Sequence, residues 1–273
     1  MKVKIICAAL LTAAAVSSVQ AATPVDIMVN GNYVKTDTEP VMENGTVLAP
    51  IRAVANALGC ESVKWNDAAK TAELVYGSKN IKISIGKSTA QVNDENKKLA
   101  SPARLINNRT FVPVRFIAEN FGADVFWNSR THTVNITKDS HSVSSEYIDT
   151  SYTEHDLDWL AKIVHAEAQG EIADGKIGVA NVVLNRVESK EFPNTIYDVI
   201  FDRKYGVQFT PIANGAIHNE PARESYSAAK KALKGANTVG ESLYFCNPLI
   251  SSNLWIMNNR PYYTSIGRHD FYL

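Results

Sequence analysis

The segment LAKIVHAEAQGE, residues 160–171, decides the fold of the C-terminal half because it contains the second half and the end of a predicted amphipathic helix. Apolar residues recur at helical spacing along one face, at Leu157, Leu160, Ala161, Val164 and Ala168. Thr153, followed three residues later by Asp156, predicts a capping box at the start of the helix. Gly170 predicts its end. The sequence therefore predicts a helix that buries one face between this cap and this glycine.

Glu167 is the candidate catalytic residue of this helix. It follows Val164 by three residues and Leu160 by seven, so its side chain leans onto the buried stripe. Burial and the negative end of the helix dipole both disfavour a carboxylate and raise its pKa. A general acid that works near neutral pH needs such a raised pKa. The alternative is an ordinary helix-end glutamate whose carboxylate lies in water.

Seven segments in order give the C-terminal half a specific resemblance. They are LAKIVHAEAQGE (160–171), GKIGVANVVLNRV (175–187), FPNTIYDVIF (192–201), QFTPIANG (208–215), LYFCNP (243–248), LWIMNNRP (254–261) and IGRHDFY (266–272). From Asp156 onward the chain resembles the SleB/CwlJ-type cell-wall hydrolases, the family of spore cortex-lytic enzymes. The resemblance implies a lysozyme-like domain, cleavage of the glycan strand of peptidoglycan in cell wall or spore cortex, and Glu167 as the acid.

The number of carboxylates leaves the reaction type open. Glycoside hydrolysis usually needs two carboxylates, and the sequence offers no clear partner for Glu167. Glu171 lies beyond the glycine, and the other candidates are expected to be caps or surface residues: Asp174, Asp198, Asp202 and Asp270. The resemblance implies lytic transglycosylase chemistry, in which the substrate's own 6-hydroxyl attacks. A muramidase that uses water remains the alternative.

Seven further residues in the resembling segments are candidate substrate ligands. Flat faces for sugar rings are expected from Phe209, Tyr244 and Trp255, and hydrogen bonds to hydroxyls and acetamides from Gln208, Thr210, Asn247 and His269. The alternative places the aromatic residues in the core and the polar ones in turns. Asn181 and Asn185 are expected to make polar contacts between helices.

Two other functions compete with glycan cleavage. A metal-dependent N-acetylmuramoyl-L-alanine amidase would need a cluster of ligands, yet the histidines of this half and Cys246 lack His-x3-His or Cys-x2-Cys spacing. We therefore expect no metal and no cofactor. A non-catalytic wall-binding protein is the second rival, although such a protein would not need Glu167.

The first 21 residues have the pattern of a signal peptide. A positive start at residues 1–4 precedes an apolar run at 5–16, and Val19-Gln20-Ala21 has the form of a cleavage site. The run is too short for a stable membrane span, so we expect a secreted, wall-associated protein without a span in the mature chain. Cys60 and Cys246 are expected to be unpaired.

Residues 46–60 and 109–123 repeat one another at a constant offset of 63. Each unit predicts a strand, a short helix initiated by proline and closed by glycine, a strand bearing Trp65 or Trp127, and a further strand. Two half-domains of this kind could share a core.

The repeat region resembles the copper amine oxidase N-terminal-like, or stalk, domain. Residues 22–131 contain no histidine, so imidazole ligation of copper is excluded there. Arg52 and Arg115 follow the two prolines at matched positions. They are interpreted either as contacts to anionic wall polymers or, preferably, as hydrogen-bond donors within each unit.

Composition completes the sequence-based prediction. The 273 residues carry 28 basic and 28 acidic side chains, so no long-range field favours nucleic acid or an anionic membrane. We predict an α+β protein with a β-rich N-terminal domain (22–137), an exposed linker (138–153) and a mainly helical C-terminal domain with a small sheet (154–273).

Overall fold

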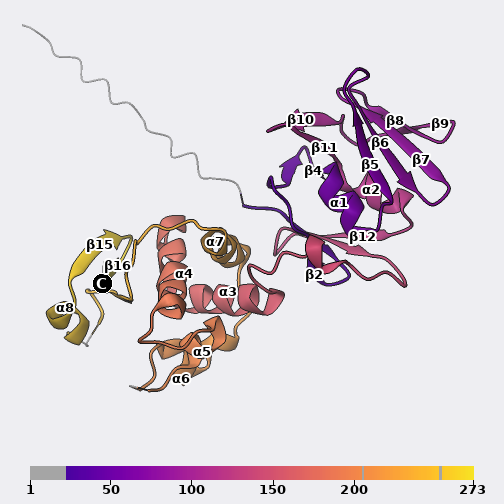
Figure 1. Cartoon of the computed structure of the whole chain (residues 1–273). Coiled ribbons are helices and arrows are strands. Elements are labelled where there is room, and N and C mark those ends of the chain that lie inside the picture. The colour runs from indigo at the N-terminus through magenta and orange to yellow at the C-terminus, as the bar shows by residue number, and fades with distance from the viewer. Residues whose placement is uncertain (1–22, 205, 252–253) are drawn as a thin grey trace, which may run out of the picture.

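The computed structural model describes residues 23–204, 206–251 and 254–273, and the predicted signal peptide lies outside them. A β-rich N-terminal part and a helical C-terminal part lie side by side (Figure 1). The C-terminal part contains one small three-stranded sheet. This arrangement confirms the predicted α+β class. Within the described ranges, no helix combines the length and apolarity needed to cross a bilayer.

The N-terminal domain is built from three sheets and two short helices. The strand orders are β12-β13-β1-β2, β10-β11-β4-β3 and β5-β6-β7-β8-β9. The bounds are β1 Asp26–Val29, β2 Asn32–Tyr33, β3 Val41–Glu43, β4 Thr46–Pro50, α1 Ile51–Ala57, β5 Ser62–Asn66, β6 Thr71–Tyr76, β7 Lys79–Ser84, β8 Thr89–Val92, β9 Glu95–Lys98, β10 Arg104–Ile106, β11 Arg109–Pro113, α2 Val114–Asn120, β12 Asp124–Asn128 and β13 Thr133–Thr137.

The predicted repeat is confirmed at the level of strands and helices. Each proline ends a strand and precedes a seven-residue helix, β4–α1 in the first unit and β11–α2 in the second. Gly59 and Gly122 follow the helices with φ of +82° and +73°, a left-handed conformation that favours glycine. Strands β4 and β11 pair antiparallel, with Val112 opposite Ala49. The two units therefore meet along one strand pair and share one hydrophobic core.

Residues 138–152 are not the exposed linker that their composition predicts. Val143 is buried in the N-terminal core, and Tyr147 and Ile148 pack against it. The His141 ring is hydrogen-bonded to the Ala57 carbonyl at the end of α1, and Ile148 forms a β-bridge with Val34. The serines between these residues face water, which makes the segment look like a linker. Its sparse apolar residues nevertheless attach it to the N-terminal domain.

Helices α3, α4 and α7 form the frame of the C-terminal domain (Figure 1). The capping box of α3 is confirmed, because Thr153 accepts from the Asp156 amide and Asp156 accepts from the Thr153 amide. The bounds are α3 Glu154–Ala168, α4 Ala173–Glu188, α5 Ile196–Phe201, α6 Thr210–Asn214, α7 Arg223–Leu233, β14 Tyr244–Cys246, α8 Trp255–Asn259, β15 Tyr262–Ile266 and β16 His269–Tyr272, with 3-10 turns η1 Ser145–Tyr147 and η2 Ala216–His218.

A buried ion-pair cluster joins the two domains. The Lys230 side chain on α7 is 0% exposed, and its Nζ lies 2.8 Å from the Asp26 carboxylate on β1. Lys234 Nζ lies 3.0 Å from the other oxygen of Asp26, and the Tyr152 hydroxyl donates to the same carboxylate at 2.6 Å. Burial alone would raise the pKa of Asp26, but the two lysine charges outweigh it and hold that pKa below its ordinary value.

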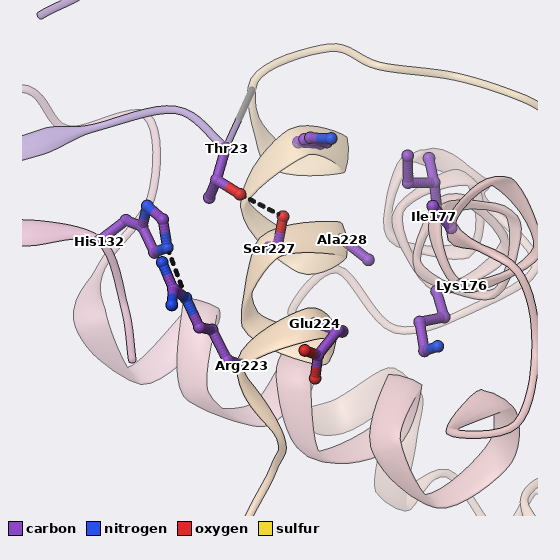
Figure 2. A pocket seen from close by; sticks show the side chains of 10 residues that line it. Thr23, His132, Lys176, Ile177, Arg223, Glu224, Ser227 and Ala228 are labelled. Carbon is purple, nitrogen blue, oxygen red and sulfur yellow. Dashed lines mark hydrogen bonds between the residues drawn. The ribbon is translucent and has the colours of Figure 1, made fainter. Parts of the chain in front are cut away.

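Polar contacts surround a cavity of about 460 Å³ beside this junction (Figure 2). The Thr23 and Ser227 hydroxyls are hydrogen-bonded at 2.7 Å, and Arg223 Nε donates to His132 Nε2 at 2.8 Å. Burial lowers the pKa of His132, and the Arg223 charge lowers it further, so the ring stays neutral and accepts this bond at neutral pH. The first residues of the described chain are thus fastened to α7.

Replacing Asp26 with Ala should destabilise the protein by about 3–5 kcal/mol, because it leaves Lys230 buried without a counter-charge. Chemical denaturation measures the loss. The exposed Arg130–Glu220 pair spans the same two domains, and Arg130→Ala should cost less than about 1 kcal/mol.

A double variant, Asp26→Ala with Lys230→Met, should regain part of the lost stability because neither charge then remains buried. If Asp26→Ala unfolds no more easily than Arg130→Ala, the cluster does not hold the domains together.

Candidate active site

Glu167 lies in the last turn of α3, one residue before the helix ends at Ala168. Val164 and Ala168 on either side of it are buried in the core of the C-terminal domain. Its own side chain is partly buried, and burial raises its pKa to about 7 from an ordinary value of 4.5. A carboxyl group with this pKa is largely protonated just below neutral pH and can donate a proton there.

Glu171 fastens the turn of the β15–β16 hairpin to the end of α3. Its Oε2 accepts from the Arg268 amide at 2.9 Å. Gly267 has a φ of +63°, and a Cβ there would overlap the same oxygen, so glycine suits both the turn and this contact. Lys176 Nζ donates to the Glu171 carbonyl at 2.6 Å. Glu171 is therefore a positioning residue that ties together α3, α4 and the hairpin.

The other carboxylates considered from sequence occupy structural positions. Asp198 pairs with the Thr195 cap of α5, and Asp202 accepts from the Lys204 amide. Asp270 accepts from the Ser265 hydroxyl, and Asp174 lies in the first turn of α4, where a negative charge favours the helix dipole. Among these residues none is left over as an evident partner for Glu167.

Four of the predicted substrate ligands keep polar or aromatic surface available. Trp255 on α8 is 50% exposed, and Thr210 is exposed at the start of α6. Gln208 is half-buried and donates to the Gly206 carbonyl, and Asn247 accepts from the Leu249 amide in a turn. A role in binding glycan stays a prediction for these four residues.

Three predicted ligands are buried, which corrects the expectation that they present side chains to substrate. Phe209 is 2% exposed, Tyr244 is 9% exposed and His269 is 7% exposed. The Phe209 ring belongs to the hydrophobic core, and the His269 ring packs edge-on against Phe245. Their burial shows that these three side chains pack within the C-terminal domain.

Two arginines that sequence reasoning missed enclose Tyr244. The Arg186 guanidinium lies 5.4 Å from the Tyr244 ring centre and the Arg260 guanidinium 4.4 Å from it. Arg186 also lies over Phe192 and Phe209, and its Nε donates to the Leu243 carbonyl at 2.8 Å. Burial lowers the pKa of Arg186 to about 10. An arginine within the apolar segment 175–187 was the signal available in the sequence.

Asn181 and Asn185 make the polar packing contacts expected of them. Asn181 donates to the Ala236 carbonyl and accepts from the Thr238 amide. Asn185 donates to the carbonyls of Gly240 and Ser242. The two side-chain amides therefore hold the loop between α7 and β14 against α4. Cys60 and Cys246 are free thiols, as predicted.

Comparison with known families identifies the domain that carries Glu167. Residues 170–272 match the profile of the Cell Wall Hydrolase family. The C-terminal domain belongs to this family. Residues 28–136 match the copper amine oxidase N-terminal domain, which places the cell wall hydrolase domain after a domain of that second family. The matched hydrolase segment begins three residues after Glu167, so the role of this residue rests on its geometry.

Similar proteins are spore cortex-lytic enzymes. The chain is 35% identical over 144 residues to that of Oceanobacillus iheyensis, covering 53% of this chain and 51% of the relative. It is 36% identical over 120 residues to that of Bacillus subtilis, covering 44% and 38%. The chain thus spans about half or less of the length of these relatives. The catalytic domain of the germination-specific lytic transglycosylase SleB from Bacillus anthracis is 36% identical, with 46% of this chain and all of that domain covered at a TM-score of 0.42.

Replacing Glu167 with Gln should stabilise the protein at neutral pH by about 1–3 kcal/mol and leave it unchanged below the ordinary pKa of 4.5. The folded pKa lies above the unfolded one, so the folded chain binds more protons between pH 4.5 and about 7. Wild-type stability therefore falls as pH rises through this window, whereas glutamine does not titrate.

Denaturant unfolding at about pH 4 and about pH 8 measures this difference. Glu188→Gln is the control, because it makes the same chemical change at an exposed position. Equal stability of wild type and Glu167→Gln at both pH values would mean that the Glu167 carboxylate is solvated.

Proposed function

We propose that the protein is an exported enzyme that cuts the glycan strand of peptidoglycan, with Glu167 as its general acid. The observation that carries the proposal is the raised pKa of Glu167, about 7, at the end of α3. Glycosidic bonds break when the leaving oxygen receives a proton, and this carboxyl group can supply one near neutral pH. Membership of the cell wall hydrolase family supports the choice of substrate.

The proposed reaction uses one carboxyl group twice. Glu167 first donates its proton to the glycosidic oxygen while the bond between that oxygen and the muramic acid C1 breaks. The Glu167 carboxylate then accepts the proton of the 6-hydroxyl of the same sugar, and O6 bonds to C1. The products are a free sugar hydroxyl and a 1,6-anhydro ring, no water is consumed, and Glu167 ends protonated.

Lytic transglycosylation is favoured over hydrolysis by the state of the other carboxylates. A hydrolase would need a second carboxylate to serve as nucleophile or to activate water. Glu171, Asp198, Asp202 and Asp270 all accept hydrogen bonds that stabilise local structure. Their engagement supports a reaction in which the substrate provides the attacking hydroxyl. The spore cortex is the candidate source of substrate, since the similar proteins are spore cortex-lytic enzymes.

Replacing Glu167 with Gln should lower the rate of glycan cleavage by about two to four orders of magnitude, because the amide has no proton to donate. Release of soluble fragments from purified peptidoglycan measures the rate, and wild-type activity should fall as pH rises above about 7. Glu171→Gln is the matched control, since its amide oxygen still accepts from the Arg268 amide. Glu171→Gln should lower the rate of glycan cleavage far less than Glu167→Gln does. A Glu167→Gln protein that cleaves normally overturns the assignment.

Activity should persist in EDTA, and the products should carry 1,6-anhydro ends. Mass spectrometry of the digest distinguishes the alternatives, because a muramidase gives reducing ends and an amidase releases free amino groups from the stem peptides. Activity that disappears with the chelator and returns with zinc would favour the metal-dependent amidase. Binding to peptidoglycan without any new ends would favour the non-catalytic wall-binding protein.

A further inference from the structure

A groove of about 810 Å³ crosses the N-terminal domain and is used by no step of the proposed reaction. Helix α1, which packs against β4, β11 and β5, lines it together with the edge strand β5 and the β10–β11 turn. Figure 1 locates these elements in the N-terminal domain. Its volume lies in the range of about 300–1,000 Å³ that ligand sites occupy. Apolar side chains, among them Val63 and Leu105, make up part of its wall.

Trp65 offers an aromatic face to this groove. The side chain is 38% exposed and lies outside the hydrophobic core. Its Nε1 donates to Asp67 at 3.2 Å, and Lys70 holds the same carboxylate at 2.8 Å, so the edge of the indole ring is anchored while the ring remains accessible. A flat, electron-rich face of this kind packs against the C–H groups of a sugar ring.

Among the residues that line the groove, three basic side chains form no ion pair, and Glu146 is the remaining acidic side chain that offsets them in part. Lys35, Arg52 and Lys64 are exposed, and none forms an ion pair with another described residue. Arg109, by contrast, is neutralised by Asp37 at 2.6 Å. The lining includes five basic and three acidic side chains, so the groove is locally positive although the chain as a whole carries equal numbers of both.

The second repeat shows that these features are not required by the fold. Arg115 matches Arg52 at the offset of 63, but it pairs with Glu119 at 3.2 Å, whereas Asn56 stands at the corresponding place in the first repeat. Trp127, which matches Trp65, packs against the hydrophobic core. The first repeat alone therefore combines an accessible indole ring with an unpaired arginine.

We propose that this groove binds a stretch of peptidoglycan glycan strand, with sugar rings on Trp65 and the carboxylates of the strand's stem peptides near Arg52, Lys64 and Lys35. The inference rests on the proposed function, because it gives the enzyme a second contact with its own polymer. Polyol-phosphate wall polymers match the charges but lack ring faces for the indole. Two contacts with one polymer raise the effective concentration of cleavable bonds near Glu167.

The test measures co-sedimentation of full-length Glu167→Gln protein with insoluble peptidoglycan that has been stripped of phosphate polymers. Trp65→Ala and the double variant Arg52→Ala with Lys64→Ala should each weaken binding about five- to tenfold. Arg115→Ala is the matched control, and it should bind as the parent does. All variants should keep the parental thermal unfolding midpoint within a few degrees. Equal binding by Trp65→Ala and the parent overturns the proposal.

Two further measurements separate this proposal from the proposed function. In the active chain, the same variants should cleave short soluble glycan fragments at the wild-type rate and insoluble peptidoglycan several-fold more slowly. If neither the wild-type protein nor the variants cleave glycan, co-sedimentation of the Glu167→Gln protein still decides whether the groove binds glycan. If the groove variants lose binding only to walls that retain phosphate polymers, the groove binds those polymers and the glycan proposal is overturned. The proposal is also overturned if nucleic acid displaces the protein from the wall and soluble glycan does not.

Discussion

The buried contact of Asp26 with Lys230 is the constraint on which the arrangement of the two domains depends. A lysine that is fully buried needs a counter-charge, and the carboxylate that provides it comes from a strand more than 200 residues earlier in the chain. Strand β1 lies inside its sheet, between β13 and β2, so the ion pair also fixes this sheet against α7. Met28 and Tyr33, from the same region, pack into the core of the C-terminal domain.

Within the C-terminal domain, the core that forms around α3 creates the environment of Glu167. Burial of the neighbouring residues of α3 removes water from one side of the carboxyl group and raises its pKa. Glu171, one turn farther along, remains a hydrogen-bond acceptor for the Arg268 amide. Two glutamates four residues apart thus acquire different roles because only the first lies on the buried face, while the second lies beyond the helix end.

Local signals in the sequence predicted the features that depend on local chemistry. The capping box at Thr153, the proline-initiated helices and the position of Glu167 relative to Val164 were all readable because each involves neighbours within a turn or two. The burial of Phe209, Tyr244 and His269 was not readable, since their neighbours come from distant segments. The prediction that residues 138–152 form an exposed linker was wrong for the same reason. The partners of this segment, Val34 and Ala57, precede it by about a hundred residues.

The way in which β1 is held has a consequence for the order of folding. Besides the adjacent β2, its partners are β13 and α7, which lie about one hundred and two hundred residues downstream, and the Thr23–Ser227 contact spans 204 residues. Contacts of such long range close large loops and form late. Strand β1 can therefore pair with β2 early, but it completes its contacts with β13 and α7 only when those distant segments have folded.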